Sequence, residues 1–455
     1  MKIPEWLPDT HRPTRPDGGP AEPIITRLAE PFARFFKVEA AGGIVLLCCA
    51  LIALGLANSP WAASFASLWQ IPVGLTIGGF TLELSLLHWI NDGAMTIFFF
   101  VVGIEIKREL VHGELRELRN AVLPVVAALG GMLVPAAIFL LFQHGESGAN
   151  GWAIPMATDI AFVAGFLALL GSRVPFGLKI LILTLAIIDD IGAVLVIAVA
   201  FTDHISLPML GWSGAGLGLT LLCRWLGVRT VPVYVLIGAG IWLAVLMAGV
   251  HATVAGVALG LLTPSNPWLA ERSLLNVLSG TERRLREDRA TPDEMEHHEE
   301  AVYLLGAAAQ ETISPLDRLE TALHPWVAFV IMPLFALANA GVRVDLAALA
   351  HPVSMATAAG LALGKPLGIV TFSALAVRLG WARLPEGVSW KVLAAAGCLA
   401  GIGFTMSLFI ADLALGDELL EFGKIGALAG SAISAMAGCA LLSWLLRKES
   451  PRGTP

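Results

Sequence analysis

Hydrophobic residues recur along this chain in long uninterrupted runs. Each run is long enough to cross about 30 Å of hydrocarbon as a helix, and glycine, proline or charged residues separate one run from the next. The pattern predicts an all-α membrane domain of twelve spans between residues 40 and 446. The expected span cores are 40–58, 87–106, 121–142, 152–170, 177–201, 207–223, 232–249, 251–263, 323–340, 354–377, 392–411 and 424–446.

The segments outside these spans are two tails and two longer loops. Residues 1–39 and 447–455 form the predicted tails, and residues 264–322 form a charged loop whose role is open between solvated linker and regulatory element. The other long loop, between the first two spans, alternates apolar and polar residues around Gly78-Gly79. That alternation predicts a small two-stranded β-hairpin over residues 73–84.

The cations in the loops predict the orientation. Lys and Arg collect in short cytoplasmic loops, and placing the N-terminus inside puts 26 of the 29 Lys and Arg residues in inner segments. The exceptions are Arg343 and Lys424, assigned to outer loops, and Lys365, which lies inside a span. We therefore expect a multi-pass membrane protein with both termini in the cytoplasm.

Composition narrows the possible functions. Hydrophobic residues make up 56% of the 455 residues and charged residues 14%, whereas a soluble domain averages about 25% charged residues. A soluble enzyme is therefore excluded, and the net charge of -7 gives no basic surface for nucleic acid. The five cysteines form no C-x-x-C pair, and we expect no resident cofactor. The surrounding partner is lipid.

Four ionisable residues lie inside predicted spans: Asp159, Asp189, Asp190 and Lys365. Such a residue costs roughly 2.5 to 3.5 kcal/mol at the centre of a membrane helix and marks an ion or proton path. Adjacent helical positions point about 100° apart, so one acid of the 189–190 pair can hold an ion while the other pairs with a cation. Close carboxylates in a poorly hydrated site also favour retention of a proton, which then competes with a hard metal ion. A purely structural ion pair with Lys365 is the alternative, and it accounts for only one of the two acids.

Two spans carry interruptions at comparable depth. Asp159 follows Pro155 and Thr158, and the span over 392–411 contains a glycine-rich stretch that includes Gly403 and Thr405. Paired broken helices indicate a midplane site in transporters built from inverted repeats, and Asp159 and Lys365 could balance the half-helix dipoles. The alternative is an irregularity of packing, because Gly and Pro are common in membrane helices.

Titratable residues also gather at the inner end of the second span, at Glu105, Lys107, Arg108 and Glu109. On physical grounds alone a solvated helix end is the slightly preferred interpretation. His251 and His324 begin the eighth and ninth spans, where a lone histidine is more often an interfacial hydrogen-bonding group than a pH sensor.

Together these patterns resemble the NhaA-type bacterial sodium/proton antiporters. The matching motifs run in order from about residue 40 to 445. They are Trp89-Ile-Asn-Asp92, Val102–Leu110, Gly151–Phe162, Leu170–Pro175, Ala186–Asp190, Gly249–Thr253, Pro333–Gly341, Gly364–Gly368 and Gly401–Ser407.

The resemblance implies twelve transmembrane helices in the inner membrane, with inverted repeats in spans three to five and ten to twelve and two crossed discontinuous helices. It also implies an extracytoplasmic hairpin that joins two protomers. Asp190 would be the principal sodium ligand and proton carrier, and Asp189 the second carboxylate, paired with Lys365 when sodium is absent. Thr158 would line the site, and Asp159 and Lys365 would compensate the dipoles.

The family's activity rises as the cytoplasm becomes alkaline. That response is assigned to positions matching Glu105, Lys107, Arg108, Glu109, Glu320 and His324, although Thr321 replaces an expected histidine. We therefore expect an electrogenic exchanger of cytoplasmic Na⁺ or Li⁺ for external H⁺, which serves sodium and pH homeostasis. The main alternative is a sodium-coupled symporter of an organic anion. An intramembrane aspartyl protease would need its acids on separate helices, and a passive channel would show single-channel current.

Overall fold

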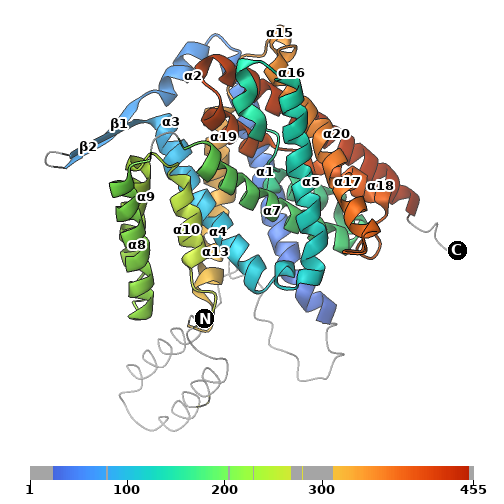
Figure 1. The fold of residues 1–455 in the computed structure, drawn as a ribbon, viewed down its shortest axis with the longest axis horizontal. Helices are drawn as coiled ribbons and strands as arrows, with labels where there is room; N and C mark the ends of the chain where they lie inside the picture. The colour runs from blue at the N-terminus through green and yellow to red at the C-terminus, as the bar shows by residue number, and fades with distance from the viewer. Residues whose placement is uncertain are drawn as a thin grey trace, which may run out of the picture.

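The computed structural model describes residues 24–77, 80–202, 205–228, 230–267, 279 and 311–449. In these residues the protein is built almost entirely of helices, with one small sheet, and the predicted structural class is confirmed (Figure 1). The end of the C-terminal tail, the first 23 residues and most of the charged loop over 264–322 lie outside the described residues.

The first part of the chain supplies ten α-helices. A π-helical turn, η1 (Trp89–Ala94), joins α3 to α4, and three short 3-10 segments are η2 (Glu114–Arg116), η3 (Ser147–Ala153) and η4 (Gly171–Arg173). The helices are α1 (Ile24–Ala57), α2 (Ala62–Trp69), α3 (Leu86–His88), α4 (Met95–Val111), α5 (Leu118–Phe142), α6 (Ile160–Leu170), α7 (Phe176–Ala200), α8 (Leu207–Trp225), α9 (Val231–Met247) and α10 (Thr253–Leu262).

The second part follows the charged loop. Two π-helical turns, η5 (Val327–Ile331) and η6 (Gly360–Gly364), join helices that run on through them. The helices are α13 (Pro315–Trp326), α14 (Met332–Asn339), α15 (Leu346–Leu349), α16 (Pro352–Ala359), α17 (Lys365–Arg378), α18 (Trp390–Ala400), α19 (Phe404–Ala414) and α20 (Asp417–Glu449).

Within the described residues, six continuous helices are long and apolar enough to cross a membrane. They cover Leu86–Val111, Arg119–Phe142, Phe176–Ala200, Pro315–Asn339, Pro352–Arg378 and Asp417–Arg447. The pair α18 and α19 meets the same criterion as a seventh span, with a bend of 50° between its halves. Shorter apolar helices, α6, α9 and α10 among them, lie between these spans. The protein is therefore a multi-pass membrane protein.

Three positions differ from the sequence-based expectation. Helix α1 begins at Ile24 and not near residue 40, so the predicted N-terminal tail is partly helical. Helix α13 begins at Pro315 and not near residue 323, because Ser314 caps it by accepting a hydrogen bond from the backbone N–H of Asp317. Lys424, expected in an outer loop, lies within α20 and is only 8% exposed.

The predicted hairpin is confirmed. Strands β1 (Pro72–Ile77) and β2 (Phe80–Ser85) pair antiparallel, with Val73 opposite Leu84, and project from one end of the helical body (Figure 1). The indole N–H of Trp89 donates to the carbonyl of Val73 at 2.9 Å. This bond fixes the base of the hairpin to the start of the second span.

Helices α5 and α17 cross at van der Waals contact. A Cβ placed on Gly368 would lie only 2.0 Å from the carbonyl oxygen of Gly130, so no larger residue fits at that crossing. Small residues at helix crossings let membrane helices gain packing energy that the hydrophobic effect does not supply in lipid. The close crossing brings Lys365, at the start of α17, next to the site described below.

Candidate ion-binding site

Two interrupted helices meet in the interior of the helical body. The predicted span over 152–170 is not one helix: η3 is followed by a turn and then by extended residues 157–159 before α6 begins. The second interruption separates α18 from α19 at residues 401–403. The backbone N–H of Asp159 donates to the carbonyl of Ile402 at 2.7 Å, so the two breaks are in direct contact.

Asp159 caps both of the helices that leave the breaks. Its Oδ1 accepts a hydrogen bond from the N–H of Phe162 in α6, and its Oδ2 accepts from the N–H of Thr405 in α19 at 3.1 Å and from the Thr405 hydroxyl. Helix N-termini carry partial positive charge and unsatisfied N–H groups, which a buried carboxylate satisfies. Gly403 belongs to the same break, where a Cβ would lie 2.3 Å from the Ser407 hydroxyl oxygen.

Lys365 and Asp189 form a fully buried ion pair beside the breaks. The Lys365 ammonium also donates to the Thr158 hydroxyl oxygen at 2.9 Å. That hydroxyl lies 2.7 Å from Asp189 Oδ2 and 2.8 Å from the carbonyl oxygen of Ala400, the last residue of α18. A hydroxyl has one hydrogen, so Thr158 donates to one of these oxygens at a time while it accepts from Lys365.

Asp190 follows Asp189 in α7 and differs from it in its partners. Asp190 is 1% exposed, and its Oδ1 is buried without a hydrogen-bond partner, as is Oδ1 of Asp189. Leaving a buried polar atom unpaired is costly in a protein interior. Two such carboxylate oxygens on adjacent residues suit a small hard cation or a proton. No group of three or more His, Cys, Asp or Glu side chains suited to a resident metal occurs in the described part of the chain.

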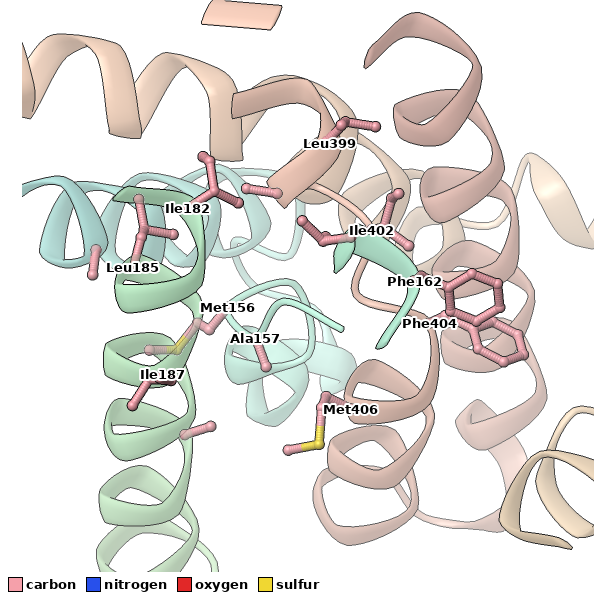
Figure 2. Close-up of a cluster of buried hydrophobic side chains, with 14 of the residues drawn as sticks. Met156, Ala157, Phe162, Ile182, Leu185, Ile187, Leu399, Ile402, Phe404 and Met406 are labelled. Carbon is pink, nitrogen blue, oxygen red and sulfur yellow. The ribbon is translucent and has the colours of Figure 1, made fainter. Parts of the chain in front are cut away.

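Apolar side chains surround these groups (Figure 2). Ile182, Leu185 and Ile187 of α7 face Met156 and Ala157 of the first break, and Ile402, Phe404 and Met406 flank the second. The rings of Phe162 and Phe404 pack edge to face with centroids 5.2 Å apart. In such surroundings, with little water to screen charge, electrostatic interactions between the buried side chains are strong.

The predicted residues at the inner end of α4 form a separate group. Arg108 forms an ion pair with Glu320 of α13, and Lys107 donates to the carbonyl of Leu261 at 2.7 Å. Glu109 Oε1 accepts from the Thr184 hydroxyl at 3.3 Å, which ties α4 to α7 five residues before Asp189. The structure therefore brings Arg108 and Glu320 together but keeps them apart from the buried pair.

The remaining candidates fit the same division. Glu105, one α-helical turn before Glu109, lies within electrostatic range of Asp190, and His324 within range of Glu320. Thr321 donates to the carbonyl of Asp317 in its own helix at 2.7 Å. His251 contacts the carbonyl of Phe201 at 2.9 Å, as an interfacial hydrogen-bonding histidine would.

Sequence reasoning missed Thr184 and the carbonyl of Ala400. Thr184 is a single polar residue in an apolar run, a weak signal because threonine can hydrogen-bond to its own helix. The Ala400 carbonyl is freed only because α18 ends there, and a sequence pattern locates a helix end within several residues at best.

A membrane protein in which two broken helices meet beside buried, partly unpaired carboxylates belongs to the class of secondary ion transporters. Residues 33–442 match the family described as Na⁺/H⁺ antiporter 1. The chain is 49% identical to the Na(+)/H(+) antiporter NhaA of Rhodopirellula baltica over 434 residues, which cover 95% of this chain and 97% of that protein.

Two further relatives give the same result. The NhaA antiporter of Rhizobium meliloti is 49% identical over 432 residues, covering 94% of this chain and 97% of that protein. NhaA 2 of Vibrio vulnificus is 44% identical over 430 residues, covering 94% and 96% respectively. The chain belongs to the Na⁺/H⁺ antiporter 1 family, and the resemblance found in the sequence is confirmed.

Proposed function

We propose that this protein is a secondary transporter that exchanges cytoplasmic Na⁺ or Li⁺ for external H⁺ by alternating access, with Asp189 and Asp190 as the shared site. The observation that carries the proposal is the buried, unpartnered Oδ1 of Asp190 next to the ion-paired Asp189. One acid is already neutralised by Lys365, so the second is the one that needs a cation or a proton.

The exchange cycle follows from competition for the same oxygens. Protons enter from the outside onto the carboxylates, the loaded site turns inward, and the protons leave to the cytoplasm. Na⁺ then binds Asp190 and draws Asp189 away from Lys365, with Thr158 lining the site. With two protons exchanged for each Na⁺, one net charge enters per cycle, driven by about 2.3 kcal/mol per 100 mV.

The architecture that would support this cycle has twelve spans and two cytoplasmic termini. Spans three to five and ten to twelve would form inverted repeats, each with one broken helix, and the two broken helices would cross at the Asp159–Ile402 hydrogen bond. Together these six spans would form a site-bearing body that moves against the remaining spans. The distribution of Lys and Arg among the loops supports the orientation.

The group at the inner end of α4 would adjust exchange to cytoplasmic pH and so serve sodium and pH homeostasis. Its candidate residues are Glu105, Lys107, Arg108, Glu109, Glu320 and His324. The hydrogen bond from Thr184 to Glu109 supports this role, because α7 carries both Thr184 and the two site carboxylates.

The hairpin would join two protomers on the extracytoplasmic side. It projects from the helical body (Figure 1), and a two-stranded sheet leaves its outer strand edges open to pair with another strand. Apart from this second copy, the partners are the lipid bilayer, Na⁺ and H⁺, with no nucleic acid. Na⁺ is cargo, so the proposed chemistry needs no resident cofactor.

Everted membrane vesicles test the proposal. Sodium added to vesicles that hold a pH gradient should dissipate it when they contain the native protein. It should fail to do so with Asp190→Asn, which is isosteric and keeps the helix. Asp417→Asn, the same change at the exposed start of α20, is the matched control and should exchange normally.

Two results would contradict the proposal. Normal exchange by Asp190→Asn would remove the assigned site. Sodium uptake that depends on an organic anion and moves no protons would favour the symporter instead.

A further inference from the structure

A second buried polar arrangement lies away from the ion site. Lys424 of α20 donates to Oδ1 of Asn339 at 3.3 Å, and Nδ2 of Asn339 donates to Oδ1 of Asn91 at 2.8 Å. Nδ2 of Asn91 then donates to Oδ2 of Asp412 at 2.9 Å. These four residues, here called the polar chain, join an ammonium group to a carboxylate through two amides.

The amides of the polar chain point the same way. Each presents its oxygen toward Lys424 and its NH₂ group toward Asp412, so both dipoles are aligned with the field between the two charges. Successive hydrogen bonds of this kind polarise one another in a poorly hydrated interior. Lys424 and Asp412 are therefore coupled although two side chains separate them.

All four residues lie at the predicted outer level of the membrane. Asn91 stands near the start of the second span, Asn339 ends α14, Asp412 is near the end of α19 and Lys424 is near the start of α20. Asn91, Asn339 and Lys424 are at most 8% exposed. Asp412 follows Thr405 by seven residues in α19, which places it about 10 Å from the ion site along that helix.

The polar chain also connects parts of the protein that must separate in the proposed cycle. Asp412 and Lys424 belong to the last two spans of the site-bearing body, whereas Asn91 in η1 and Asn339 in α14 belong to the other spans. The middle hydrogen bond, between Asn339 and Asn91, holds two elements of the second group together. The two end bonds cross from one group to the other.

We propose that the polar chain is an outer strap that holds the ion site closed to the outside, and that its two end bonds break each time the site opens outward. Lys424 and Asp412 act as positioning residues, because they set the balance between inward-open and outward-open forms without touching the transported ion. The proposal rests on the proposed function, since it needs a site that alternates between the two sides.

Reversible cross-linking tests the strap. In a background with the native cysteines replaced by serine, Asn91→Cys and Asp412→Cys place two thiols where the amide and carboxylate now meet. A short bifunctional thiol reagent should join them and reduce sodium/proton exchange at least tenfold, and a reductant that cleaves the link should restore it. The reduced form serves as its own control for exchange.

A matched pair within one body controls for the cross-link itself. His351 and Phe422 stack with ring centroids 3.8 Å apart, and both belong to the region that carries the tenth and twelfth spans. His351→Cys with Phe422→Cys, linked in the same way, should exchange at the rate of its reduced form. A linked 91–412 pair that still exchanges fully would overturn the proposal, as would a pair that no short reagent can join.

A second measurement avoids cross-linking. The double variant Asp412→Asn with Lys424→Met removes both end charges together, so neither remains buried alone. A weaker strap should favour the outward-open form and change the ratio of the sodium KM values measured from the outside and from the inside by about three- to tenfold. A merely structural role would lower the amount of protein or the rate and leave that ratio unchanged, which would overturn the proposal.

These results are separable from a failure of the proposed function. If the Asp190→Asn protein exchanged normally, the assigned site would be wrong whatever the strap did. If that variant were inactive and the linked 91–412 pair exchanged fully, the site would stand and the strap would fall.

Discussion

Lys365 and Asp189 form an ion pair with no solvent exposure on either side chain, at the point where α17 crosses α7 and the two helix breaks. A buried ion pair contributes little net stability, because removing two charges from water offsets their attraction. Its value here is that the Lys365 ammonium holds one of two adjacent acids and leaves the other unpartnered. The same attachment makes Asp189 dependent on Lys365.

Lys365→Met should therefore destabilise the protein by about 3–5 kcal/mol, because Asp189 is left as an uncompensated buried charge. The change should appear as a lower Tm of the purified protein. The double variant Asp189→Asn with Lys365→Met removes both charges and should recover most of the loss. A double variant no more stable than the single one would show that the ion pair is not the cause.

Thr158→Val should reduce sodium/proton exchange strongly while the protein still folds. Valine has the shape of threonine but lacks the oxygen that accepts from Lys365 and the hydrogen shared between Asp189 and Ala400. Thr158→Ser keeps that oxygen and should retain most activity. Exchange rates in everted vesicles at matched protein amounts measure the difference, and equal rates for valine and serine would contradict a role for the hydroxyl.

Glu320→Gln should move the midpoint of the activity–pH curve to more alkaline pH. The ion pair of Arg108 with Glu320 requires an ionised carboxylate, and glutamine imitates the protonated form that predominates in acid. Sodium-triggered proton release between about pH 6.5 and 8.5 measures the midpoint. Glu418→Gln, at the exposed start of α20, should leave the curve in place.

Gly368→Ala should greatly lower the yield of folded protein, because the added methyl group would overlap the carbonyl of Gly130 and force α5 and α17 apart. Gly214→Ala is the matched control, since nothing lies within 4 Å of a Cβ at that position of α8. Size-exclusion chromatography in detergent compares the two. A well-folded Gly368→Ala protein would mean that the crossing can relax.

Local signals in the sequence were sufficient for the structural class, the hairpin and the identity of the buried charges. Asp189, Asp190 and Lys365 stand out because lipid-facing runs otherwise exclude ionisable residues. The alternation around Gly78-Gly79 likewise fixes the hairpin without information from elsewhere in the chain. The glycine-rich stretch near Gly403 and Pro155 marked both interruptions.

Contacts between distant segments could not be predicted in this way. The start of α13 was placed too late because its first turns are polar, and apolar length was the signal used. Lys424 was assigned to a loop because a lysine at a span boundary usually reaches water. Its burial depends on Asn339, 85 residues away, and the bond between Asn91 and Asp412 spans 321 residues. No local pattern carries such a pairing.

The presence of one lysine beside two adjacent acids has an electrical consequence. With both acids ionised and Lys365 protonated the group carries one net negative charge, so a bound Na⁺ makes it neutral and two bound protons make it singly positive. The sodium-loaded form then crosses the membrane field without electrical work. The voltage, negative inside, acts on the inward movement of the doubly protonated form, so a polarised cell would extrude sodium faster by accelerating the half-cycle in which no sodium is carried.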